Sequence, residues 1–199
     1  MKKSLPLLLV LLCLLALLAA CTGETPAPQI RPMSLTADQQ EIVDFLSSPI
    51  QEILLFEYNL GEDISHIEVW VEVYHYGERI DQPSALWMFS DTQFPFSDGP
   101  MAIIITQPAD NQFQWTISFD GSSSTGMVWT AEHSHTSRGF GPIIEAVEII
   151  DGQEILLYIS RFTSRNSMNT MGDLQWYLEH PEALAGFTYV HLIKARFTS

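Results

Sequence analysis

Cysteine is scarce in this 199-residue sequence, which contains only Cys13 and Cys21. Both lie near the N-terminus, so the rest of the chain has no disulfide, no thiol nucleophile and no thiolate ligand for a metal. The folded part must therefore be stabilised by an ordinary hydrophobic core, and a chain of this length is long enough to bury one.

Basic residues are also few: nine Lys and Arg stand against 24 Asp and Glu, giving a net charge of −15. Lys194 is the only lysine after Lys3, and the six arginines are scattered. Without a basic stripe to neutralise phosphates, nucleic-acid binding is excluded. The same charge would repel an anionic lipid surface, whereas a cationic partner is compatible with it.

Catalytic motifs are missing as well. There is no Gly-x-Ser-x-Gly sequence, and the glycine- and serine-rich segment 121–126, predicted to be a flexible loop, lacks the Lys-Ser/Thr ending of a phosphate loop. The loop acids do not form a calcium-binding loop, and 24 acidic residues allow too many carboxylate pairs to assign a glycosidase site. The sequence therefore indicates no cofactor and does not favour an enzyme.

What the N-terminus does contain is an export signal. Lys2 and Lys3 precede an apolar run from Leu5 to Leu18, and two alanines follow it. This order of charge, apolar core and small residues is typical of a signal peptide, here residues 1–20. A permanent transmembrane helix is disfavoured, because the run is shorter than about 20 residues and no positive cluster follows it.

The end of this signal, Leu18-Ala19-Ala20-Cys21, resembles the lipobox of bacterial lipoproteins. The resemblance implies that Cys21 receives a diacylglyceryl group and becomes the new N-terminus, outside the cytoplasm. Two acyl chains are sufficient for stable anchoring to the cell membrane, or to the outer membrane if the cell has two. An ordinary signal peptide with a chance cysteine is the alternative. Loss of Lys2 and Lys3 would change the net charge from −15 to −17.

Three regions follow from composition: the signal peptide, a lipidated N-terminus and flexible tether over 21–35, and one domain over 36–199. The tether is rich in proline and has no apolar periodicity. Thr36 and Gln39 have the spacing of a capping box and predict a short helix ending near Pro49 that packs one face on the domain. A second short helix is predicted over 171–184.

Outside the helices the apolar period is two, which predicts strands. Predicted strands cover 53–60, 65–76, 86–89, 101–106, 113–119, 127–133, 143–150, 155–162 and 189–197. We expect segment 101–106 to be a central strand covered on both faces, and 113–133 and 143–162 to form hairpins. This pattern predicts an all-β fold, an antiparallel β-sandwich with one or two peripheral helices; a barrel is the rival.

The clearest strand, 65–76, suggests a binding surface. Its β-branched residues alternate with a second row, and we expect the β-branched row to face the core. Aromatic rings interleaved with acids suit a sugar platform or a protein contact patch, although cross-strand pairing also explains such aromatics. The candidate binding residues of this second row are Glu68, Trp70, Glu72, Tyr74 and Tyr76.

A metal site is the second hypothesis. His133 and His135 share a face if their segment is extended, so both imidazoles can reach one ion. A third ligand would have to come from elsewhere, with His66, His75 and His191 as candidates.

These observations predict a lipid-anchored extracytoplasmic lipoprotein that acts as a non-catalytic binding module for a glycan or an envelope protein. The alternatives are a metal-dependent enzyme or metal-binding protein using His133 and His135, and a structural subunit of an envelope assembly.

Overall fold

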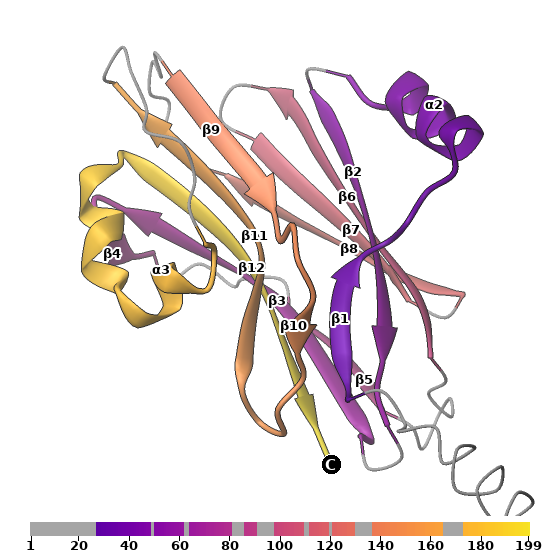
Figure 1. Ribbon diagram of the computed structural model, residues 1–199. Coiled ribbons are helices and arrows are strands. Elements are labelled where there is room, and N and C mark those ends of the chain that lie inside the picture. Colours follow the sequence, from indigo (N-terminus) through magenta and orange to yellow (C-terminus); the bar gives the residue numbers. More distant parts are fainter. Residues whose placement is uncertain are drawn as a thin grey trace, which may run out of the picture.

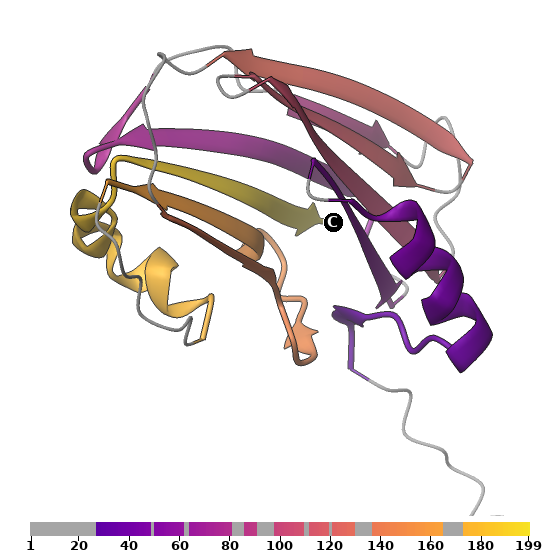
Figure 2. The same ribbon diagram turned by 90° about the horizontal axis from the view of Figure 1, so that it is seen from above.

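The fold is a sandwich of two antiparallel sheets, seen in a computed structural model (Figure 1). It describes residues 27–48, 50–61, 64–80, 86–90, 98–109, 112–119, 121–129, 137–164 and 173–199, with 86–90, 128 and 129 as backbone only. The two sheets lie face to face with their apolar sides together (Figure 2). The predicted all-β sandwich is confirmed.

Six strands form sheet A, in the order β10, β1, β2, β6, β7, β8. Their bounds are β10 Val147–Glu148, β1 Gln29–Pro32, β2 Gln51–Asn59, β6 Gly99–Ala109, β7 Gln112–Phe119 and β8 Ser122–Trp129. Sheet B has the order β4, β3, β12, β11, β9, and β5 also pairs with β3. Its bounds are β4 Glu78–Arg79, β3 His66–His75, β12 Tyr189–Thr198, β11 Glu154–Thr163, β9 Ser137–Pro142 and β5 Leu86–Ser90.

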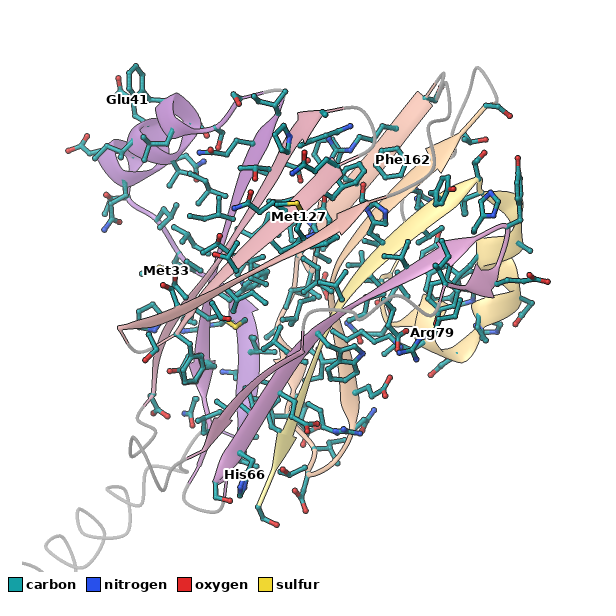
Figure 3. The ribbon with its side chains drawn as sticks, turned by 180° about the vertical axis from the view of Figure 1, so that it is seen from behind. Met33, Glu41, His66, Arg79, Met127 and Phe162 are labelled. Carbon is teal, nitrogen blue, oxygen red and sulfur yellow. The ribbon has the colours of Figure 1, made fainter. Side chains whose placement is uncertain are left out.

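Alternating side chains build the core, as expected of half-buried antiparallel strands. In β7 every second residue, from Phe113 to Phe119, is buried, and Trp115 is fully enclosed. The predicted inward row of β3 is confirmed, since Ile67, Val69 and Val71 are inaccessible to solvent. Phe162 of β11 lies between the sheets in Figure 3 and contacts Phe113 edge-on at 5.2 Å.

Two expectations near the N-terminus need correction. Part of the predicted tether is strand β1, whose Ile30 is fully buried and which pairs with β2 on one side and β10 on the other. Residues 29–32 therefore belong to the sandwich and not to a tether. Helix α2, Ala37–Leu46, forms where Thr36 and Gln39 predict it, but it buries none of its residues, so the expectation that it packs one face on the domain is wrong.

Other differences concern pairing. The predicted hairpin over 143–162 does not form, because β10 crosses to sheet A and pairs with β1 while β11 stays in sheet B. The serine-rich segment 121–126, predicted to be a loop, lies largely in strand β8. Strand β6 alternates rather than being buried on both faces, and it continues past Pro108 through an irregularity in its register.

The second predicted helix is two short pieces, α3 Trp176–Glu179 and the 3₁₀ turn η1 Pro181–Gly186. Pro181 begins the second piece because it cannot donate the backbone hydrogen bond that would continue α3. Leu174, Tyr177 and Leu184 are buried against the outer side of sheet B (Figure 2). The described part of the chain contains no helix with the length and apolar character needed to span a bilayer.

Candidate functional site

The outer face of β3, predicted as a binding surface, is organised around the carboxylate of Glu72. This side chain is only 5% exposed, yet it has four partners. It accepts hydrogen bonds from Trp70 Nε1 at 3.2 Å and Tyr74 Oη at 2.8 Å. Arg79 Nη1 and Lys194 Nζ each lie 2.9 Å from its oxygens. Both oxygens are therefore occupied, and the group is an internal ion cluster rather than an open acid.

Cross-strand register explains the cluster. Lys194 of β12 lies opposite Trp70 of β3, so its ammonium reaches Glu72 one step along the same face and also Glu154 of β11 at 3.0 Å. One buried lysine of the middle strand, β12, thus lies between two carboxylates contributed by its two neighbours, β3 and β11. This arrangement compensates the burial cost of each charge.

The electrostatics follow from these contacts. Burial opposes ionisation of Glu72, but the hydrogen bonds and positive charge supplied chiefly by Lys194 outweigh it and hold the pKa of Glu72 below its ordinary value. Burial, together with the hydrogen bond to the Glu72 carboxylate, raises the pKa of Tyr74. Tyr74 therefore remains a neutral donor at physiological pH.

The aromatic residues of this face do not form one exposed platform. Trp70 is 8% exposed, and the guanidinium of Arg196 covers its ring at 5.5 Å while pairing with Glu68 at 2.8 Å. Tyr76 is 59% exposed, but it lies in the turn after β3 with a positive φ of 49°. Sugar stacking needs an accessible ring face, and Trp70 does not offer one.

A second polar cluster, which the sequence analysis missed, joins the two sheets. Glu52 of β2 accepts hydrogen bonds from Arg138 of β9 and Tyr158 of β11, both at 2.7 Å. Arg138 also donates to Gln107 and Ser160 at 3.4 Å. The partners of Glu52 are 86 and 106 residues away, so no local motif points to them.

This cluster ties one sheet to the other. Burial raises the pKa of Glu52, although Tyr158 and Arg138 oppose the rise. Burial and the neighbouring Glu52 charge raise the pKa of Tyr158. Because each Glu52 oxygen already has a donor, the geometry indicates a structural tie between the sheets rather than a general base.

A groove lies where the chain crosses from sheet B to sheet A. It is lined by the end of β9, by the segment from there to β10, and by the residues just before α3. It encloses about 670 Å³ and is lined mainly by apolar side chains; its described lining residues include three carboxylates and no lysine or arginine. Ile144 is 82% exposed and Phe140 is 48% exposed, while Ile143 and Leu174 form a buried floor. Its acidic lining residues are Glu145, Glu148 and Asp173.

A smaller hollow adjoins this groove and shares Phe140 and Pro142 with it. It encloses about 420 Å³, and its other wall runs from Ser47, just after α2, to Leu54 of β2. Sequence periodicity gave no sign of either hollow, because their walls come from segments that the chain places in different sheets.

The described residues do not contain the predicted lipid site, and they form no metal site. Cys21, His133 and His135 lie outside the described residues. Among the proposed third ligands, His191 is enclosed by the rings of Phe113 and Trp115, and His75 stacks on Tyr189 at 4.6 Å. Across the described ranges, no group of three or more His, Cys, Asp or Glu residues is arranged to hold a metal ion.

Comparison with known proteins gives a family. The sequence model of the YgaN domain matches residues 29–197, which covers both sheets from β1 to β12. No curated protein and no solved structure matches the chain.

Proposed function

The chain belongs to the YgaN domain family, and we propose that it is a lipid-anchored extracytoplasmic lipoprotein whose sandwich is a non-catalytic module for binding an envelope protein. The lipobox-like sequence ending at Cys21 supports the anchor. The groove after β9 supports the binding role and is the observation on which that role rests.

The lining of the groove indicates what it binds. Apolar walls favour burial of apolar side chains, and about 25 cal/mol is gained for each Å² removed from water. Three carboxylates stand among the described lining residues without a lysine or arginine beside them, so they favour a ligand with positive charge. A protein segment that carries lysine or arginine beside apolar residues has both properties. A neutral glycan lacks the positive charge, and Trp70 is covered.

Selection of displayed peptides by the purified mature protein tests this role. We expect enriched peptides to combine apolar residues with lysine or arginine. Ile144→Ala should weaken their binding about tenfold, since it removes the most exposed apolar contact of the groove. Ile150→Ala is the matched control, because Ile150 is 50% exposed but does not line the groove. Enrichment of acidic peptides, or equal loss in both variants, would contradict the proposal.

A further inference from the structure

Helix α2 presents apolar side chains to solvent. Phe45 is 86% exposed, Ile42 60% and Leu46 52%, and none of the ten helical residues is buried. Only Val43 is half-buried. Figures 2 and 3 show the helix outside sheet A, with Glu41 directed away from the sandwich. An exposed apolar row of this kind marks an interaction surface.

The helix is nevertheless specified by its own sequence. The Thr36 hydroxyl accepts from the Gln39 backbone N–H at 3.3 Å, and the Gln39 side chain accepts from the Thr36 N–H at 2.9 Å. Gln40 donates to Asp44 at 2.7 Å one turn later. An isolated helix of about ten residues is marginal in water, and no residue of α2 is fully buried by the sandwich. Packing on a partner would supply what the helix lacks.

Its apolar residues have the spacing of a docking helix. Ile42, Phe45 and Leu46 stand at positions i, i+3 and i+4, which place them on one face. This is the pattern with which an amphipathic helix enters the groove of another protein. Ile50, 61% exposed, follows just after the helix.

Charge decides which partner fits. The helix carries Asp38, Glu41 and Asp44, and the sequence has no lysine or arginine between Arg31 and Arg79. A second copy would bring these acids against their equivalents, and an anionic lipid surface would repel them. A groove rimmed by lysine or arginine is complementary to them.

Position favours a protein over the membrane, a step that rests on the proposed anchor at Cys21. Gln29 of β1 lies opposite Asn59, at the end of β2, whereas α2 adjoins the start of β2 through the Ser48–Gln51 bridge (Figure 1). The length of β2 separates these points by roughly 27 Å at about 3.4 Å per residue. The helix is therefore at the end of sheet A away from where the tether enters.

We propose that α2 is a docking helix that places Ile42, Phe45 and Leu46 in an apolar groove, rimmed by lysine and arginine, on another extracytoplasmic protein. The proposal names the surface and partner chemistry of one contact and is independent of the groove after β9.

The test is photo-crosslinking in cells that produce the lipidated full chain. A photoreactive phenylalanine analogue replaces Phe45, and the matched control carries it at Ile150, which is also exposed but lies between β10 and β11. We expect one crosslinked protein at position 45 and none of it at position 150. That protein is then purified, and its crosslinked residue is mapped. We expect an apolar groove flanked by basic residues and binding that is weakened at least tenfold by Phe45→Ala and by high salt.

Several results would overturn this inference: a crosslink to a second copy, to lipid or within the same chain, no crosslink, or a mapped site without basic residues. Phe45→Ala is not expected to change the melting temperature, because the side chain is exposed. Peptide selection by the groove is measured separately. If groove binding persists while position 45 crosslinks to nothing, α2 is not a docking helix and the proposed function stands.

Discussion

At the scale of single residues, buried charge is the unexpected feature of this molecule. Glu72 and Lys194 are each less than a tenth exposed. Glu72 nevertheless lies on the face of β3 that the sequence predicted to be a binding surface. The contacts of these two residues with Trp70, Tyr74, Arg79 and Glu154 satisfy them. Such a cluster is costly to break, because removal of one member leaves another charge buried without its counter-ion.

Glu72→Gln should therefore lower the free energy of unfolding by about 3 kcal/mol at pH 7, measured by urea denaturation. Glu57→Gln is the control: it removes an exposed pair with Arg31 and should cost less than about 1 kcal/mol.

Comparison of Glu72→Gln with the wild type also gives a prediction about the pH dependence of stability. The pKa of Glu72 is lower in the folded chain than its ordinary value of 4.5. The stability contributed by its ionisation is therefore present above pH 4.5 and lost as pH falls through the folded pKa. We expect the difference between wild type and Glu72→Gln to shrink on acidification below that value. A difference that grows toward low pH would contradict the assigned contacts.

At the scale of elements, the turn between β3 and β4 fixes how η1 packs on sheet B. Gly77 has φ +82°, and a Cβ added there would lie 2.9 Å from the Cα of Ala185. Gly121 has a similar φ of +77° in the β7–β8 turn, but no atom of the described residues lies within 4 Å of its added Cβ. The two glycines thus share a backbone requirement and differ in packing.

Gly121→Ala should cost about 1–2 kcal/mol, the penalty of a left-handed conformation. Gly77→Ala should cost about 1–3 kcal/mol more, because η1 must move away from the turn. Thermal and urea denaturation of both variants compare these values. Equal costs would show that the contact with Ala185 is unimportant.

At the scale of the whole molecule, the sandwich separates chain entry from α2. Chain entry and α2 lie at opposite ends of sheet A, whereas the groove reaches the point of entry, because its lining residue Glu148 pairs with Gln29. A protein fixed through the tether would present α2 at a distance from the bilayer. The prediction that belongs to this scale is attachment itself.

Cys21→Ser should release the protein from the membrane fraction, because stable anchoring requires the two acyl chains on that residue. Cys13→Ser should leave fractionation unchanged, since Cys13 is predicted to leave with the signal peptide. Cell fractionation and mass spectrometry of the N-terminal residue measure both. A wild-type protein recovered with an unmodified Cys21 would contradict the anchor.

Sequence alone determined the all-β class, most strand positions and the start of α2, because period-two burial and capping are local properties, but it left a barrel as the rival of the sandwich. The fold decided what local pattern does not encode: that β10 pairs with β1, that Trp70 is covered, and that Glu52 meets Arg138 and Tyr158 across the sheets. Those outcomes depend on partners that are distant in sequence and are brought together only when both sheets pack.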